Sequence, residues 1–463
     1  MTGGQYSMTP QSVPPIETDY RRIRTQLPVP ESLSVLEQLA SSEPRSMGGQ
    51  PPVVWHKAEG FQVEDEWGNR WIDWSSGVLV TNAGHGHPRI REALAELNGR
   101  PLLATYVFPH RSRAELVSKL AQLAPDGLDK VFLLSTGSEA TENAIKLART
   151  WGVRNFGPEK HVIVSFGNAF HGRTLGAQLA GGMDHQKDWI VRTDAGFVQV
   201  PFPDGYKTED RSFDLFIDSL DRQGVDPSQV AGVISEGYQG VGPDFMPAEY
   251  AQKLRQWCSE HDVVLIMDEV QSGFGRTGRL FCFEHYGIVP DLICCGKGVS
   301  SSLPLSAVVG RQEIMDQYAP GSMTSTHSAH PFCCAAALAS IDAILDEGLV
   351  QHAADMEPVL RKGLDEIQSA HEDVVGCAQA RGLVGGLQMA RPGTKEPDPD
   401  LAMKISEKSF QKGLLMFAPV GIAGECIKIA PPLCIPEDAL TEGIEVLSEA
   451  IREACEEHSP ART

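Results

Sequence analysis

The sequence has little positive charge. It contains 40 Lys and Arg residues against 61 Asp and Glu residues, which gives a net charge of −21 at pH 7. Proteins that bind nucleic acids or anionic membrane surfaces need clustered positive charge to neutralise phosphate groups. The charge balance therefore argues against both kinds of partner. It also means that a small anionic substrate would depend on single Lys or Arg side chains inside a pocket.

Long apolar runs and closely spaced cysteine pairs are missing as well. No apolar run approaches the roughly 18 residues of a membrane-spanning helix, and the start, MTGGQYSMTP, has neither the basic nor the apolar region of a signal peptide. The 10 cysteines include no C-x-x-C pair and are typical of small buried apolar residues in a reducing compartment. We predict a cytoplasmic protein without a metal site.

An acid and a lysine carry the main chemical signal. Asp268 ends the apolar run that begins at Val263, and Lys297 follows later within the stretch CCGKG. Pyridoxal phosphate (PLP) enzymes need a carboxylate that keeps the pyridine nitrogen protonated and a lysine amine that forms a Schiff base with the cofactor aldehyde. Each residue also has a simpler explanation, because buried strands often end in Asp and a Gly-Lys-Gly stretch is commonly a solvated turn.

A possible phosphate site lies upstream. The strand-like run VFLL, Val131 to Leu134, leads into STGSEATENAIKLA, whose apolar spacing predicts a helix over Ser135 to Ala148. The first turn of such a helix attracts anions, and the Ser138 hydroxyl adds a donor. The alternative is a serine N-cap with Glu139 and Glu142 in the first turn.

Two further stretches suit a flat, phosphorylated cofactor. After the predicted strand His161 to Phe166, Phe170 offers a ring for stacking and Gly172 a permissive backbone, although a core aromatic would look the same. The hydroxyl-rich stretch SMTSTHS, Ser322 to Ser328, offers further phosphate contacts, although such clusters are often ordinary turns.

Together and in this order, these stretches resemble the class III (ω-amino acid, or GABA/ornithine type) PLP-dependent aminotransferases. The resemblance runs from about residue 45 to about residue 452, and DEVQSGFGRTG with its downstream lysine is its most specific motif. It implies a fold-type I architecture, amine and 2-oxo acid substrates, and a homodimer or a dimer of dimers with active sites at the subunit interface.

The resemblance also implies a role for single residues. Lys297 is similar to the Schiff-base lysine and Asp268 to the partner of the pyridinium nitrogen. The other positions that resemble cofactor contacts are Val270 under the ring, Gln271 at the phenolic oxygen, Gly137 and Ser138 at the phosphate, Phe170 as the stacking ring, and Thr326 reaching the phosphate of the neighbouring subunit.

Two positions depart from the family pattern and bear on the substrate. Lys428 stands before Pro431 where the family usually has an arginine that binds the α-carboxylate, and a lysine offers a point charge without a bidentate fork. Val241 stands where GABA-type members have a glutamate that pairs with that arginine. The predicted substrate contacts are Lys428, Val241 and Val78, unless Lys428 is a solvated strand residue.

The layout predicts an α/β protein. Short apolar strands (131–134, 161–166, 231–236, 263–268 and 291–295) alternate with helical stretches such as Glu249 to His261, which indicates a central, mostly parallel sheet of the seven-stranded type with flanking helices, plus a smaller α+β domain. We predict a polar extension over residues 1–44, a segment over 45–109 that packs with the small domain, a large PLP-binding domain over 110–345, and a C-terminal small domain over 346–463.

Finer element assignments complete this layout. The first ordered strand is predicted to start in QPPVVW, Gln50 to Trp55, followed by a hairpin over Phe61 to Trp74. The C-terminal part is predicted as an amphipathic helix, a strand-rich stretch from Gly382 to Pro436, and a closing helix from Glu437 to Glu456.

The predicted reaction is the transfer of an amino group from an amine or a 4-aminobutyrate-like ω-amino acid to a 2-oxo acid. A second hypothesis keeps the cofactor and changes the reaction to decarboxylating transamination, racemisation or an aminomutase step. A third is a catalytically idle binding protein of the PLP fold. The presence of both Lys297 and Asp268 argues against the third.

Overall fold

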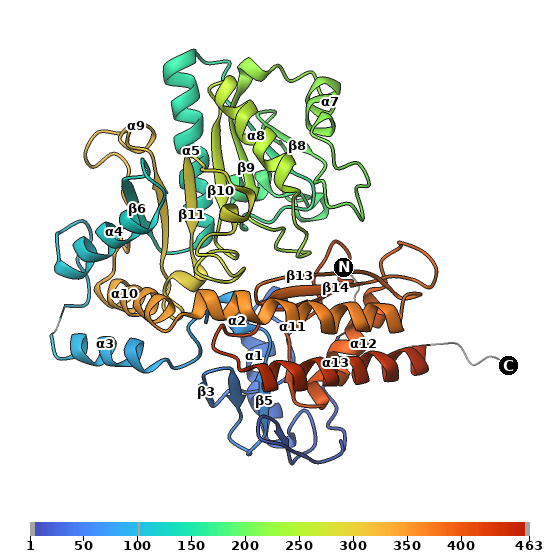
Figure 1. Ribbon diagram of the computed structural model, residues 1–463. Helices are drawn as coiled ribbons and strands as arrows, with labels where there is room; N and C mark the ends of the chain where they lie inside the picture. Colours follow the sequence, from blue (N-terminus) through green and yellow to red (C-terminus); the bar gives the residue numbers. More distant parts are fainter. Residues whose placement is uncertain (1–4, 101, 459–463) are drawn as a thin grey trace. The chain divides into compact units, whose positions relative to one another are not determined.

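The computed structural model describes residues 5–100 and 102–458. The chain forms two compact units, one of residues 1–87 with 351–463 and the other of residues 88–350 (Figure 1). The second unit contains Lys297 and Asp268, so it is described first.

A seven-stranded sheet forms the centre of the 88–350 unit. Its strands follow the order β6-β12-β11-β10-β9-β7-β8, and every neighbouring pair is parallel except those that β12 makes with β11 and β6. This confirms the prediction of a mostly parallel sheet. The bounds are β6 Lys130–Leu134, β7 Val162–Phe166, β8 Phe197–Val200, β9 Val230–Glu236, β10 Val264–Asp268, β11 Leu292–Cys295 and β12 Ser306–Gly310.

The helices of this unit include α4 to α9, which flank the sheet, and α3 and α10, which pack against each other. They are α3 Pro88–Asn98, α4 Arg111–Leu123, α5 Gly137–Phe156, α6 Leu175–Ala180, α7 Asp214–Arg222, α8 Ala248–Glu260, α9 Gln312–Met315 and α10 Pro331–Asp346, with short 3-10 turns at Asp184–Gln186, Pro227–Gln229, Cys282–Tyr286 and Lys297–Val299. The central strands β9 and β10 are buried along their whole length, because helices cover parallel sheets on both faces.

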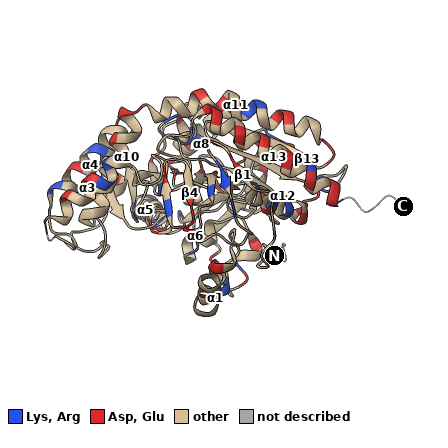
Figure 2. Ribbon diagram, turned by 90° about the horizontal axis from the view of Figure 1, so that it is seen from below, with Lys and Arg blue, Asp and Glu red and all other residues tan. Residues whose placement is uncertain are grey.

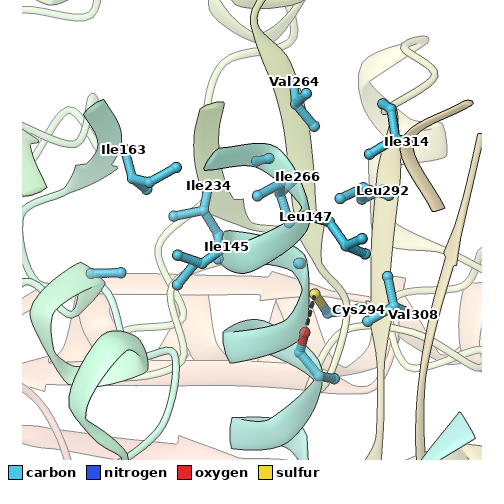
Figure 3. Close-up of a cluster of buried hydrophobic side chains, with 14 of the residues drawn as sticks. Ile145, Leu147, Ile163, Ile234, Val264, Ile266, Leu292, Cys294, Val308 and Ile314 are labelled. Atoms are coloured by element: carbon cyan, nitrogen blue, oxygen red, sulfur yellow. Dashed lines mark hydrogen bonds between the residues drawn. The ribbon is translucent and has the colours of Figure 1, made fainter. Parts of the chain in front are cut away.

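The core of this unit lies between α5 and the sheet. Ile145 and Leu147 of α5 pack against Ile234, Ile266 and Leu292 on three neighbouring strands (Figure 3). Burial of this face fixes the helix against the sheet, so its first turn has a defined position at the end of β6.

The other unit holds two smaller sheets. The larger has the order β1-β2-β5-β4-β3 with β15 beside β5, and the smaller has the order β13-β14-β16. The bounds of its elements are β1 Ile16–Glu17, β2 Arg22–Ile23, β3 Lys57–Glu59, β4 Gln62–Glu64, β5 Arg70–Asp73, β13 Val375–Arg381, β14 Val384–Met389, β15 Leu414–Leu415, β16 Cys426–Ile429, α1 Leu33–Ser42, α2 Ser76–Leu79, α11 Leu349–Ala370, α12 Pro399–Gln411, α13 Glu437–His458, and 3-10 turns at Pro30–Ser32 and Arg45–Met47.

One element prediction in this unit is wrong, and another is incomplete. The stretch Gln50 to Trp55 is not a strand, because the adjacent prolines 51 and 52 have no N–H groups for hydrogen bonds to a neighbouring strand. The first strands of the chain are β1 and β2, which precede this stretch. The predicted strand-rich stretch from Gly382 to Pro436 contains the strands β14, β15 and β16, and it also contains the helix α12. The signal for α12 is the pair Asp398-Pro399, where the Asp398 side chain caps the helix by accepting the amide of Leu401.

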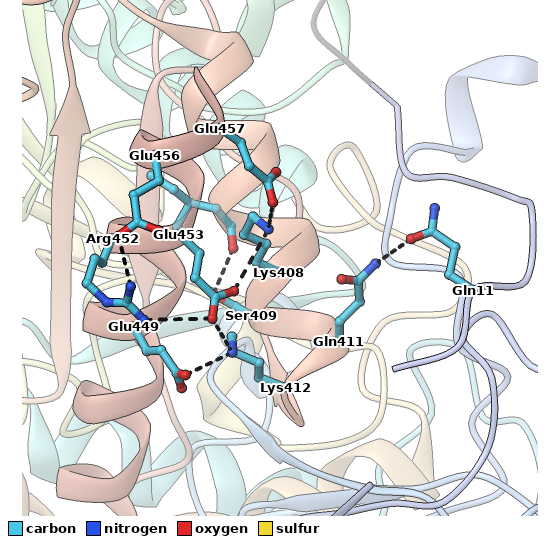
Figure 4. A network of polar contacts seen from close by, with 11 residues as sticks. Gln11, Lys408, Ser409, Gln411, Lys412, Glu449, Arg452, Glu453, Glu456 and Glu457 are labelled. Atoms are coloured by element: carbon cyan, nitrogen blue, oxygen red, sulfur yellow. Dashed lines mark hydrogen bonds and ion pairs between the residues drawn. The ribbon is translucent and has the colours of Figure 1, made fainter. Parts of the chain in front are cut away.

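Ion pairs join α12 to the closing helix α13. Lys412 Nζ lies 2.9 Å from Glu453 Oε1 and 3.2 Å from Glu449 Oε1, and Lys408 Nζ lies 2.7 Å from Glu457 Oε1 (Figure 4). Acidic positions recur along α13 (Figure 2). Pairs of this kind near the surface add little stability singly, but together they set how α12 lies against α13. Among the described residues, no helix is long and apolar enough to cross a membrane.

Candidate active site

A cavity of about 300 Å³ opens at the carboxyl edge of the seven-stranded sheet. Its lining comes from the segments that follow β6, β7, β9, β10 and β11. The lining residues are Thr136, Gly137, Ser138, Phe170, His171, Gly172, Arg173, Glu236, Tyr238, Asp268, Val270, Gln271 and Lys297. All predicted cofactor contacts except Thr326 are among them. Open parallel sheets bind ligands at this edge.

One wall is the first turn of α5. Thr136, not a serine, caps this helix, and it forms a capping box with Glu139, so the proposed serine N-cap is wrong. The amide of Glu139 donates to the Thr136 hydroxyl and the amide of Ala140 to the Thr136 carbonyl. The first-turn amides of Gly137 and Ser138 therefore remain beside the cavity as donors for an anion.

The Ser138 hydroxyl packs tightly against the loop after β7. It accepts a hydrogen bond from the amide of Arg173 (3.3 Å). Gly172 has a φ of +132°, and a Cβ atom built on it would lie 2.2 Å from Ser138 Oγ. Only glycine fits at this position without displacing Ser138.

Asp268 is fixed by two contacts at the end of β10. Its Oδ1 accepts the amide of Val270 (3.1 Å), and its Oδ2 lies 2.8 Å from Nδ1 of the buried His171. Burial lowers the pKa of His171, but the hydrogen bond and charge of Asp268 and the charge of Glu236 outweigh this, so the pKa is raised overall. The imidazole thus orients the carboxylate of Asp268 through a direct hydrogen bond.

Lys297 begins a short 3-10 turn directly after β11, with a left-handed φ of 42°. Such a backbone conformation is rare outside glycine and recurs at functional sites. Burial lowers the pKa of the Lys297 amine, while the charges of Asp268 and Glu236 oppose this shift. A lowered pKa leaves more of the amine neutral and nucleophilic.

Val270 forms an apolar wall between Gly137 and Gly296. A Cβ atom on Gly137 would lie 2.7 Å from Val270 Cγ1, and one on Gly296 would lie 3.1 Å from it. The two glycines thus allow the segments after β6, β10 and β11 to meet. The Phe170 ring also lines the cavity, with the Arg173 guanidinium 5.5 Å from its centroid.

The other predicted residues lie elsewhere. Thr326 is exposed and Val241 is buried, and neither lines this cavity. Lys428 lies in β16 of the other unit with 2 % of its surface exposed, so its interpretation as a solvated strand residue is wrong. Val78, also in that unit, is 46 % exposed and has a φ of 64°. A β-branched residue in this conformation is strained.

Sequence reasoning missed three buried cavity residues, His171, Glu236 and Tyr238. His171 stands next to the predicted Phe170, and Glu236 is the last residue of a predicted strand, so a signal existed for both. Nε2 of His171 is buried without a hydrogen-bond partner. A buried polar atom of this kind beside a cavity is typical of a binding site.

The residues present fit PLP. An amide-lined helix start suits a phosphate group, a carboxylate oriented by a histidine suits a pyridinium nitrogen, and a desolvated lysine suits an aldehyde. The sequence model of the family "Aminotransferase class-III" matches residues 45–451. The chain belongs to the class III aminotransferases. It is therefore a PLP-dependent enzyme that transfers amino groups, and the predicted family, cofactor and reaction class are confirmed.

Curated relatives of this class III aminotransferase cover nearly its whole length. It is 35% identical to a 4-aminobutyrate aminotransferase of Mycobacterium leprae over 448 residues, which are 93% of this chain and 98% of that protein. It is 33% identical to a 5-aminovalerate aminotransferase of Pseudomonas aeruginosa, covering 91% and 98% of the two chains.

Solved structures agree with the fold. An ornithine aminotransferase of Toxoplasma gondii superposes with a TM-score of 0.82 at 26% identity, covering 93% of this chain and 97% of that one. An amine transaminase from an uncultivated Pseudomonas species, solved in its PLP-bound form, gives a TM-score of 0.80 at 26% identity, covering 89% and 97%. The fold-type I prediction is confirmed.

Proposed function

We propose that this aminotransferase moves an amino group from an ω-amino acid or amine to a 2-oxo acid, with Lys297 as the lysine that binds the cofactor. The observation that carries the assignment is the single cavity in which Lys297, Asp268 and the first turn of α5 meet. When bound, PLP supplies an aldehyde that an amine can condense with and a ring that accepts electrons.

Lys297 has two tasks in this proposal. Its desolvated amine attaches the cofactor, and once an incoming amine has displaced it, the same nitrogen holds and moves a proton at the substrate carbon. Desolvation suits both tasks, because it lowers the pKa of the amine and so increases its neutral, nucleophilic fraction.

Asp268 holds the proton on the pyridine nitrogen. The His171 imidazole donates to Asp268 Oδ2 and orients the carboxylate. Gly137 and Ser138 bind the phosphate through first-turn amides and a hydroxyl, Val270 and Phe170 contact the ring, and Gln271 binds its phenolic oxygen.

We also propose that the enzyme is a homodimer, or a multiple of one, in which Thr326 serves the neighbouring subunit. The exposed loop before α4 supports this, because Leu103 is 66% and Phe108 is 71% exposed. Neighbouring large apolar side chains that are this exposed are typical of a surface that another protein covers. Tyr106 of this loop lies 2.9 Å from Thr324, beside Thr326. Sedimentation at working concentration tests the proposal, and a fully active monomer contradicts it.

The substrate proposal rests on Lys428 and Val241. The names of the relatives point to 4-aminobutyrate and 5-aminovalerate, both ω-amino acids. Lys428 supplies one positive charge without a bidentate fork, and Val241 is apolar where GABA-type members have an acid. We expect a preference for ω-amino acids and amines with apolar bodies over glutamate. A cytoplasmic location is part of the proposal and is supported by ten cysteines that form no disulfide.

A panel of amine donors against pyruvate and 2-oxoglutarate tests the reaction. The proposal predicts that product forms only when both an amine and a 2-oxo acid are present, and that Lys297→Ala abolishes it. Turnover of a labelled amine without any oxo acid would favour a racemase or aminomutase instead. Release of carbon dioxide in step with turnover would favour decarboxylating transamination.

A further inference from the structure

A second carboxylate lies beside Asp268 at the edge of the sheet. Glu236 ends β9 and is the register partner of Asp268 on the parallel strand β10. Both side chains line the cavity, and both residues are 5% exposed. The proposed roles of Lys297 and Asp268 leave Glu236 without a task.

Glu236 joins two loops of the cavity. Its Oε2 accepts the amide of Phe170 (3.0 Å), and its Oε1 accepts the amide of Gly240 (2.7 Å). A Cβ atom on Gly240 would lie 2.3 Å from Gln271 Nε2 and 2.8 Å from Glu236 Oε1. The Glu236 carboxylate therefore fixes the main-chain amides of Phe170 and Gly240, and it lies close to the Gln271 side-chain amide.

The charge of Glu236 acts on the groups around it. Burial raises its pKa to about 7, and Asp268 adds to this rise while His171 opposes it. Glu236 in turn opposes the lowering of the Lys297 pKa and helps to raise that of Tyr238. These four groups come from β10, from the loops after β7 and β9, and from the turn after β11.

We propose that Glu236 is a positioning residue of the active site, whose carboxylate fixes the Phe170 and Gly240 segments and supplies negative charge that favours the protonated Lys297 nitrogen. The inference rests on the proposed role of Lys297. Because Asp268 is committed to the pyridinium nitrogen, Glu236 is the second acid able to balance a cation on Lys297.

The test is a pH titration of the visible absorbance of protein-bound PLP, which reports protonation of the nitrogen that joins it to the lysine. Glu236→Gln removes the charge, so the midpoint is expected to move to lower pH by about 0.5 to 1 unit. Glu236→Asp keeps the charge but withdraws it by one methylene, so its midpoint should lie between those of the parent and Glu236→Gln.

Glu142→Gln is the matched control. Glu142 Oε1 also accepts two main-chain amides, those of Gly176 (2.8 Å) and Ala177 (3.1 Å), but it does not line the cavity. The titration midpoint of Glu142→Gln should equal that of the parent protein. An equal shift in the control would show that loss of a structural acceptor, and not the charge of Glu236, moves the titration.

The inference is overturned if folded Glu236→Gln titrates as the parent does. If Glu236→Gln fails to fold, Glu236→Asp decides, because a midpoint equal to that of the parent then contradicts the proposal. A parent protein that binds no PLP on Lys297 would instead refute the proposed function, and it is recognised by the missing visible band before any variant is compared.

Discussion

Both carboxylate oxygens of Asp268 have a hydrogen-bond partner, the Val270 amide at Oδ1 and the His171 imidazole at Oδ2. Asp268→Asn keeps the size of the side chain but cannot carry the negative charge that holds a proton on the pyridine nitrogen. We expect PLP still to bind and kcat to fall by about 10³-fold or more. Steady-state rates with a saturating amine measure this. Activity within about tenfold of the parent would show that Asp268 is not the pyridinium partner.

Lys428 and Val241 are the residues proposed to set substrate choice. Lys428→Arg keeps the positive charge and adds a bidentate fork for a carboxylate. If Lys428 sets substrate choice, this variant should raise kcat/KM for 2-oxoglutarate above that of the parent. A parent that already uses GABA and 2-oxoglutarate well, together with an unchanged Lys428→Arg variant, would contradict the proposal.

At the residue scale, the sequence predicted those positions whose signal is local. Asp268 and Lys297 follow apolar runs that mark buried strands, so their placement at one sheet edge could be expected. The partnership of His171 with Asp268 and the register of Glu236 beside it depend on which strands are neighbours. Strand order follows from packing of the whole unit and is not written in any local pattern.

At the scale of elements, the first turn of α5 and the loop after β7 pack tightly against each other beside the cavity. Gly172→Ala places a Cβ atom against Ser138 Oγ and in a left-handed conformation. We expect a dissociation constant for PLP at least about tenfold higher, since strain of about 1 to 2 kcal/mol must be relieved. Fluorescence titration of the apoprotein measures this constant.

Gly167→Ala in the same loop is the control for Gly172→Ala. Gly167 has no positive φ, and a Cβ atom added to it would lie no closer than 3.7 Å to another atom, the Val200 carbonyl oxygen. This variant should bind PLP as the parent does. Equal affinities for the Gly172 and Gly167 variants would show that close packing against Ser138 does not shape the phosphate site.

Elements were predictable where one pattern dominates over several residues. The strands β6, β7, β9, β10 and β11 and the helix α8 fall within a residue or so of their predicted ranges. The short strand β8 and the helix α12 were not foreseen, and α12 interrupts a stretch whose other elements are strands. The start of α5 was foreseen, but its cap is Thr136, since the capping box needs Glu139 at the third helical position.

At the scale of the whole molecule, three buried groups link stability to pH. Burial raises the pKa of Glu236 and of Glu269 to about 7, and the pKa of His171 is also raised. Native protein then binds more protons than unfolded protein between about pH 4.5 and 7, so the free energy of unfolding falls as pH rises through this window. The carboxyl side chains whose pKa is lowered titrate below this pH window.

We therefore expect the apoprotein to be more stable at about pH 5.5 than at about pH 7.5, by about 2 to 4 kcal/mol. Urea unfolding at the two pH values measures the difference. Glu236→Gln removes one of the three groups, so its unfolding free energy should depend less on pH. A stability that rises from the lower to the higher pH would contradict the assigned burial of these groups.

The proposed function depends on Lys297 as the lysine that carries PLP. Borohydride reduction of the purified enzyme, followed by proteolysis and mass spectrometry of the peptides, tests it most directly, because reduction makes the link between lysine and cofactor permanent. We expect one pyridoxyl-labelled lysine per chain, Lys297, and no label in Lys297→Ala. A pyridoxyl group on any other lysine, or an unlabelled Lys297 in active enzyme, would contradict it.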